Sequence, residues 1–178
     1  MGFGIASAMM MLSLLSTAVA APPDLCQDGL ARFTRNFTEL YMAYWLVKSE
    51  PDAYSWQQMQ QDEKADWSGV RNHQAANNMR AMKLGDQCFF YHSNEGKEIV
   101  GTVAVSQLYH PDPSDETGKF GMVEMTAGKP LPKAVTLASI KADPKLKNMV
   151  LVKNSRLSVQ PVTDIEWKIV CTLGGLKQ

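Results

Sequence analysis

The stretch Trp67-Ser68-Gly69-Val70-Arg71-Asn72-His73-Gln74-Ala75 has the pattern of a turn that leads into a helix. Apolar residues recur at helical spacing from Val70 onward and predict a helix over about residues 71–82, with Arg71 and Gln74 on a second, polar face. A helix N-terminus presents unpaired N–H groups, Gly69 lets the backbone approach a ligand closely, and Arg71 adds positive charge. The turn is therefore suited to bind a phosphate or a planar polar group. A capped helix with a solvated polar face is the alternative.

The composition of the whole chain is that of a globular protein. Its 178 residues are 45% hydrophobic and 20% charged, and the formal net charge is zero. These values predict one domain around one core. Proteins that neutralise many phosphates of duplex nucleic acid are usually clearly basic, so we expect any nucleic-acid contact to be small and local.

Cysteine and histidine spacing argues against a disulfide framework and against a metal site. The three cysteines, Cys26, Cys88 and Cys171, are odd in number and far apart, and the three histidines lack ligand spacing. We expect Cys88 and Cys171 to be reduced residues of the core, and we expect no bound metal.

Residues 1–41 differ in character from the rest of the chain. The apolar run from Ile5 to Val19 leads into an alanine-rich segment that resembles the cleavage site of a secretory signal. No Lys or Arg precedes the run, and it is short for a membrane span. We favour translation from Met42, with residues 1–41 as an extension outside a domain of residues 42–178. A cytoplasmic location without stable membrane association then follows, and export through a signal in residues 1–21 is the alternative.

Short strands with irregularly inserted helices characterise the chain after Met42. The pattern predicts a strand over 44–47, a hairpin of strands 87–92 and 98–107, and a further strand over 120–126. It predicts helices over 55–63, 136–142 and 163–173, the last opened by a capping box of Thr163 and Glu166, and a loop over 110–118. We assign Trp45 and Trp56 to the core. The class is α+β, a small mixed β-barrel rather than a doubly wound sheet.

Four blocks in the same order resemble the EVE domain family over about residues 43–175. They are Tyr44-Trp45-Leu46-Val47-Lys48-Ser49-Glu50-Pro51, Trp67 to Ala75 as above, Phe89-Phe90-Tyr91-His92-Ser93 and Arg156-Leu157-Ser158-Val159-Gln160-Pro161. The segment that begins at Met42 also resembles the usual beginning of bacterial members. The resemblance implies a PUA-like fold, a small mixed β-barrel flanked by helices. It also implies kinship with YTH domains, which hold a methylated adenine in an aromatic cage, and no metal or organic cofactor.

The resemblance further implies a non-enzymatic module that recognises a modified base in DNA or RNA. Similarity to the YTH arrangement places Lys48, Ser49 and Trp67 at the pocket, where Trp67 would stack on the base. Ser49, Asn72 or Gln74 would contact the polar edge of the base. The remaining predicted pocket residues are Gly69, Val70, Arg71, His92 and Phe120, and the predicted phosphate contacts are Arg71, Lys153 and Arg156.

The second aromatic wall of this pocket has three alternatives. Many family members carry a tryptophan where this chain has Lys119-Phe120-Gly121-Met122. The wall is therefore Phe120, or Tyr109, or it is missing.

Two other functions compete with base recognition. Lys48 and Glu50 resemble the lysine and carboxylate pair of some ASCH domains, which share the PUA-like fold and hydrolyse modified nucleosides. The third function is a protein-interaction module. A solvated ion pair is the simplest interpretation of Lys48 and Glu50.

Overall fold

The structure, a computed structural model, describes residues 42–177. The predictions for residues 1–41 lie outside the described residues, and the boundary at Met42 stays a prediction. The elements, in chain order, are β1 (Tyr44–Ser49), α2 (Trp56–Asp62), β2 (Lys64–Asp66), α3 (His73–Ala81), β3 (Gln87–His92), β4 (Glu98–Pro111), β5 (Gly121–Thr136), α4 (Leu137–Ala142), α5 (Val150–Lys153), β6 (Val159–Val162) and α6 (Asp164–Leu173).

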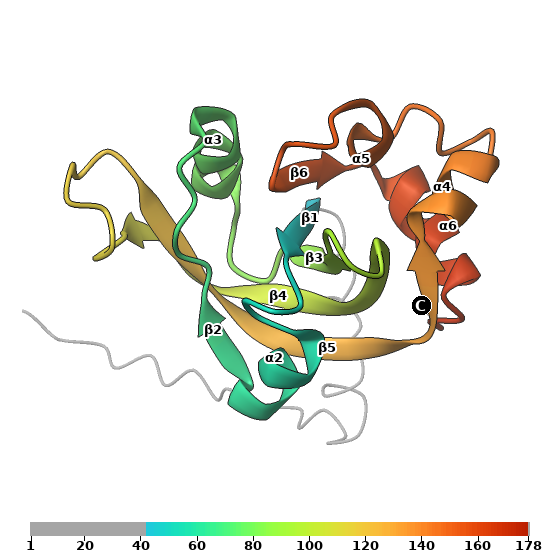
Figure 1. Ribbon diagram of the computed structural model, residues 1–178, viewed down its shortest axis with the longest axis horizontal. Helices are drawn as coiled ribbons and strands as arrows, with labels where there is room; N and C mark the ends of the chain where they lie inside the picture. Colours follow the sequence, from blue (N-terminus) through green and yellow to red (C-terminus); the bar gives the residue numbers. More distant parts are fainter. Residues whose placement is uncertain (1–41, 178) are drawn as a thin grey trace, which may run out of the picture. The chain divides into compact units, whose positions relative to one another are not determined.

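One mixed sheet of six strands, in the order β2-β5-β4-β3-β1-β6, organises these elements (Figure 1). β1 and β3 pair in parallel, and their register places Ser49 beside His92. The other neighbouring strands pair antiparallel, including β3 with β4, so the predicted hairpin is confirmed. Because β1 and β3 are parallel, their carboxyl ends lie side by side at the same end of the strands.

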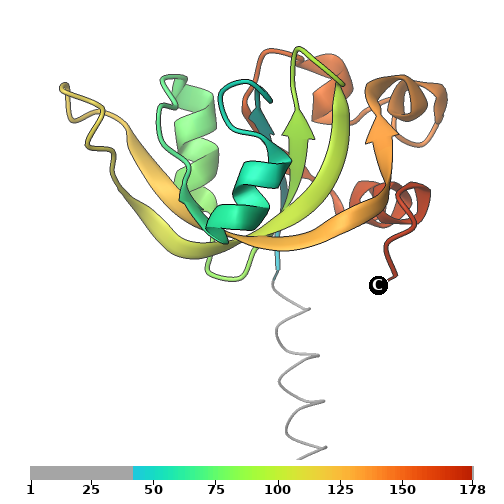
Figure 2. The same cartoon turned by 60° about the horizontal axis from the view of Figure 1, so that its bottom comes forward.

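Both faces of the central strands are buried, which explains why these strands are almost continuously apolar. Successive side chains of a strand point to opposite faces. Trp45 and Phe90 accordingly join a core with α2 and α3, whereas Leu46 and Phe89 join a second core with α4, α5 and α6. Figure 2 shows β4 and β5 as strongly curved ribbons, with α2 and α3 on the inner side of the curve.

The α+β class is confirmed, but the sheet is not closed into a barrel. β2 and β6 are its two edges, and α3 packs against β6, β5 and β4. α3 buries Ala75, Ala76 and Met79 against these strands, and the two edges β2 and β6 do not pair with each other.

Four helices, α2, α3, α4 and α6, begin directly after a polar residue that caps them. Ser55 accepts a hydrogen bond from the Gln58 amide at the start of α2, and the capping box of Thr163 and Glu166 opens α6, as predicted. α3 begins two residues later than predicted because Asn72 is its N-cap. Local signals of this kind set helix ends more sharply than apolar spacing does.

Several packing predictions are also confirmed. Trp45, Trp56, Cys88 and Cys171 are all buried. Gly101 on β4 lies directly against the indole of Trp56, where a side chain would collide with the ring. None of the helices between residues 42 and 177 is both long and apolar enough to cross a membrane.

Candidate functional site

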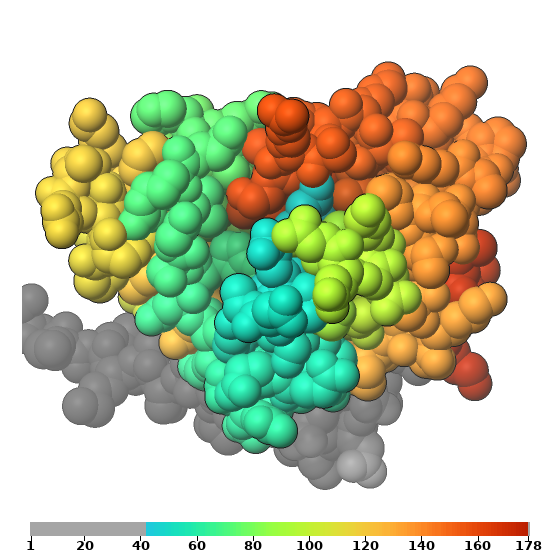
Figure 3. All heavy atoms as spheres, in the orientation of Figure 1, coloured from blue at the N-terminus to red at the C-terminus, as the bar shows by residue number. Residues whose placement is uncertain are grey.

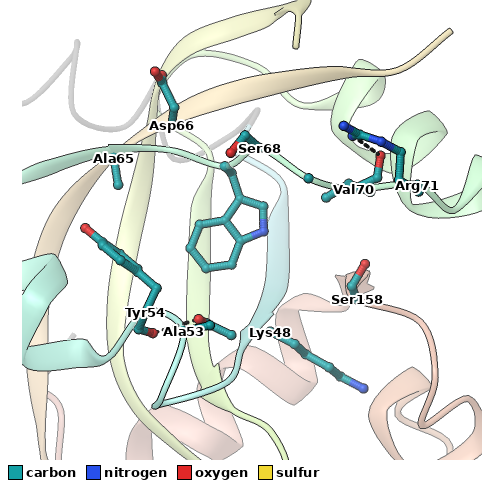
Figure 4. Close-up of a pocket in the computed structure, with 12 residues that line it drawn as sticks. Lys48, Ala53, Tyr54, Ala65, Asp66, Ser68, Val70, Arg71 and Ser158 are labelled. Atoms are coloured by element: carbon teal, nitrogen blue, oxygen red, sulfur yellow. Dashed lines mark hydrogen bonds between the residues drawn. The ribbon is translucent and has the colours of Figure 1, made fainter. Parts of the chain in front are cut away.

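A cavity of about 400 Å³, here called the Trp67 pocket, lies beside the carboxyl end of β1, within the size range of small-molecule sites. Figure 3 shows the surface hollowed between the residues around β1 and α2 and those that lead into α3, and Figure 4 shows the lining. The lining residues are Lys48, Ser49, Ala53, Tyr54, Ala65, Asp66, Trp67, Ser68, Gly69, Val70, Arg71 and Ser158. Six of them, Lys48, Ser49, Trp67, Gly69, Val70 and Arg71, are residues that the sequence placed at a pocket.

Trp67 is held between the core and the pocket. Its side chain is largely buried and meets the Phe90 ring edge-on, with ring centroids 5.6 Å apart. Its backbone amide donates to the carbonyl of Val123 at 2.8 Å, directly after β2. The indole is therefore a fixed surface on the pocket wall.

Tyr54 supplies a second aromatic side chain to the pocket, and the sequence analysis missed it. Its hydroxyl donates to Asp62 Oδ2 at 2.9 Å and lies 3.7 Å from Met59 Sδ, so α2 holds the ring in place. Burial and the hydrogen bond to Asp62 raise the pKa of Tyr54 to about 12. The sequence contained a signal for this residue, because Tyr54 is an aromatic residue in the loop of residues 51–55, which follows a strand already assigned to the pocket.

Ser49 ties the loop that carries Tyr54 to the end of β1. Its hydroxyl donates to the Tyr54 carbonyl at 2.6 Å. Because a hydroxyl has one proton and two lone pairs, the oxygen of Ser49 is left to accept a hydrogen bond within the pocket.

Lys48 ties a second loop, residues 154–158, to the same strand end. Its backbone amide donates to the Ser158 carbonyl at 3.0 Å, and its ammonium donates to the Ser155 carbonyl at 2.8 Å. Burial lowers the pKa of Lys48 to about 8. Lys153 and Arg156 are exposed on either side of Ser155 and bring two further cations to this loop.

Asp112, in the loop between β4 and β5, holds the opposite end of the pocket wall. Its carboxylate accepts the Gly69 amide at 2.9 Å and Arg71 Nη1 at 2.8 Å. Burial alone would raise the pKa of Asp112, but hydrogen bonds from Ser114, Arg71 and Gly69 hold that pKa well below its usual range. The pattern Asp112-Pro113-Ser114, typical of a turn closed by a carboxylate, was the signal that the sequence analysis did not use.

Four predicted pocket residues do not line the Trp67 pocket among residues 42–177. Asn72 Oδ1 caps α3 by accepting the Ala75 amide at 3.0 Å, and Gln74 is exposed on the first turn of that helix. His92 is buried, and its Nε2 accepts the Trp56 amide at 3.1 Å, which satisfies a donor at the start of α2.

Phe120 is the fourth of these residues, and it packs on the far side of the Gly69–Asn72 turn. Its ring centroid lies 5.0 Å from that of His73 and 5.8 Å from Arg71 Cζ. Tyr109, the alternative second wall, packs instead against the Arg80 guanidinium, 4.6 Å from Cζ to its ring centroid. The second aromatic side chain in the lining is Tyr54.

The charged groups differ from those of a lysine and carboxylate catalytic pair. Within residues 42–177 the ion pairs join Lys64 with Glu124 and Arg71 with Asp112, and Glu50 is exposed outside the pocket lining. The same residues contain no group of three or more His, Cys, Asp or Glu side chains arranged to hold a metal ion.

Comparisons with known proteins place this geometry in a family. Residues 43–173 match the EVE domain. Human thymocyte nuclear protein 1 is 33% identical to this chain, in an alignment that covers 79% of this chain and 77% of the human protein. Among solved structures, Rpa0253 from Rhodopseudomonas palustris is 55% identical, with a TM-score of 0.73 over 77% of this chain and 96% of that one.

A second solved structure is that of the human THYN1 protein in complex with 5-methylcytosine-containing DNA. It is 32% identical to this chain, with a TM-score of 0.70, and the match covers 76% of this chain and 99% of the human one.

Proposed function

The chain belongs to the EVE domain family, and on this premise we propose that it is a non-enzymatic nucleic-acid-binding module that takes a modified base into the Trp67 pocket. The human relative bound to DNA with 5-methylcytosine supports this proposal and makes that base the first to test. A base can enter such a pocket only when it leaves its stack, and it then needs a flat aromatic surface and a few polar contacts.

One observation carries the proposal: a cavity of suitable size has two aromatic side chains, Trp67 and Tyr54, in its lining. Each side chain is fixed by contacts outside the cavity, Trp67 by Phe90 and Tyr54 by Asp62. Fixed aromatic surfaces lose little conformational entropy when a base stacks on them, so this arrangement favours binding of planar groups.

The polar groups of the pocket suit the edge of a base. The Ser49 oxygen is free to accept a hydrogen bond, which fits an exocyclic amino group such as that of cytosine. Arg156 lies on the loop that borders the pocket and Lys153 ends α5 directly before it, so we assign phosphate contacts to these two residues. Arg71 was a third candidate, but its guanidinium is paired with Asp112.

The positions of Lys48 and Glu50 support binding rather than hydrolysis. A catalytic pair would direct both groups at one substrate, whereas the Lys48 ammonium is bound to the carbonyl of Ser155 and Glu50 lies outside the pocket lining. We infer that Lys48 serves to position the loop that carries Ser158.

Fluorescence anisotropy with matched oligonucleotides, with and without 5-methylcytosine, in single and double strands, tests this function. Trp67→Ala should raise the Kd for the modified strand about 5- to 150-fold, since base stacking on an aromatic side chain contributes about 1–3 kcal/mol. Leu84→Ala, at a residue that is 62% exposed, serves as the control. Urea unfolding of each variant shows that the domain is folded.

Two results would refute the proposal. One is a wild-type protein that binds modified and unmodified strands equally for each of a panel of modified bases. The other is a folded Trp67→Ala variant that keeps the wild-type preference.

A further inference from the structure

Asp112 is a buried carboxylate that lies outside the pocket yet contacts its wall. It is 3% exposed. Its two oxygens accept four hydrogen bonds, from the Gly69 amide, from Arg71 Nη1 and from the amide and hydroxyl of Ser114. A buried carboxylate is stable only when it is paired in this way, so its location is determined by those partners.

Two of these partners are the donors that a phosphate would otherwise use. Gly69 and Arg71 precede α3, where a free amide and a guanidinium form a favourable site for an anion. The Asp112 carboxylate occupies that place from within the protein. Arg71 makes two further contacts, since Nη2 donates to Ser114 Oγ at 2.8 Å and the Phe120 ring lies 5.8 Å from Cζ.

We propose that Asp112 is a positioning residue that makes the Trp67 pocket selective for a modified base. It fixes the pocket wall of residues 69–71, and it occupies the Gly69 amide and the Arg71 guanidinium so that neither donates to a phosphate of the nucleic acid. This inference rests on the proposed function. Phosphate contacts strengthen binding to every sequence equally, whereas contacts to a base distinguish one base from another. Neutralising a cation near the pocket weakens binding to unmodified strands, so it increases the preference of such a protein for the strand with the modified base.

The test is Asp112→Asn, which keeps the shape and one acceptor oxygen but removes the negative charge. Arg71 then becomes available to a phosphate, so the variant should bind unmodified DNA about fivefold more tightly at 0.1 M salt. The slope of log K against log salt concentration should steepen by about 0.9, the value for one added contact with duplex DNA. The preference for the modified strand should fall about fivefold, because the wall loses its charged anchor.

Glu116→Gln is the matched control, since it removes the same charge from an exposed residue of the same loop. It should leave both the salt slope and the preference near their wild-type values. A purely structural role for Asp112 predicts something different, namely weaker binding to both strands with an unchanged slope, and that outcome would overturn the inference.

Arg71→Met is the second variant, which tests whether Arg71 contacts a phosphate if Asp112→Asn does not fold. Since Arg71 makes no phosphate contact in the proposed arrangement, its removal should leave the salt slope unchanged, and a slope shallower by about 0.9 would contradict the inference. The salt slope is measured on any DNA, whereas the proposed function depends on the preference of the wild-type protein. A wild type without preference therefore rejects the function, and an altered slope in Arg71→Met rejects only the role of Asp112.

Discussion

Replacement of Tyr54 separates the aromatic surface of the pocket from the hydrogen bond that holds it. Tyr54→Ala removes the ring from the lining together with the bond to Asp62, whereas Tyr54→Phe removes only the hydroxyl. In Figure 4 the Tyr54 ring lies across the pocket from Ser158 and Arg71. The two variants therefore test whether this ring forms a wall for the base.

Loss of the ring and loss of the hydroxyl should have different effects on binding and on stability. Stacking of a base on an aromatic ring contributes about 1–3 kcal/mol, so Tyr54→Ala should raise the Kd for the modified strand about 5- to 150-fold. The hydrogen bond to Asp62 contributes about 1 kcal/mol to the free energy of unfolding, and both variants should lose it. Tyr54→Phe should keep its Kd within about twofold of the wild type because its ring remains.

Anisotropy titrations give the Kd values, and urea unfolding gives the free energy of unfolding of each variant. A folded Tyr54→Ala protein with wild-type affinity would refute the assignment of Tyr54 to the base wall. Equal losses of affinity in Tyr54→Phe and Tyr54→Ala would also refute it, since they would show that the hydroxyl and not the ring carries the effect.

Three further predictions concern stability. Gly101→Ala should lower the free energy of unfolding by about 1–3 kcal/mol, because the new methyl group would overlap the Trp56 ring, and urea unfolding measures the loss. Burial lowers the pKa of His92, against an opposing effect of the Glu98 charge, so the folded state binds the proton less readily than the unfolded state does. The contribution of His92 to stability should consequently be constant above about pH 6.5 and fall as the pH decreases below it, and urea midpoints should show a smaller fall in His92→Gln over that range. Thr163→Ala should cost about 0.5–2 kcal/mol through loss of the α6 cap, and thermal unfolding that leaves the midpoint unchanged would contradict this expectation.

The parts of the fold that the sequence predicts are those with strong local signals. β3 spans Gln87–His92 as predicted, and Ser55 and Thr163 mark the starts of α2 and α6. β2 was not predicted, because its three residues, Lys64–Asp66, form a strand only through pairing with β5. The open sheet was not predicted for a similar reason, since the packing of α3 against β4, β5 and β6 depends on tertiary contacts.

The residues of the candidate site also fall into those that the sequence predicted and those that it did not. Lys48 and Ser49 end a strand that the sequence predicts, the family resemblance places these two residues and Trp67 at a pocket, and all three line it. Tyr54 lies in a loop that is fixed by hydrogen bonds with Ser49 and Asp62, and Asp112 contacts Gly69, which lies 43 positions away in the sequence. The sequence shows that such residues are polar or aromatic, but not which segment they will contact.

The Trp67 pocket is assembled from loops, and each loop is fixed by a hydrogen bond from outside its own segment. Ser49 holds the Tyr54 carbonyl, the Lys48 ammonium holds the Ser155 carbonyl, and Asp112 holds the Gly69 amide. The sheet supplies the common support, because the parallel pairing of β1 with β3 buries both faces of β1 and leaves its polar residues at the strand end. Loops fixed by a few hydrogen bonds can change in sequence at their other positions without disturbing either core, whereas the residues that make those bonds cannot. The choice of base should therefore vary with the loop residues that face the pocket, and the existence of the pocket should depend on the three anchoring contacts.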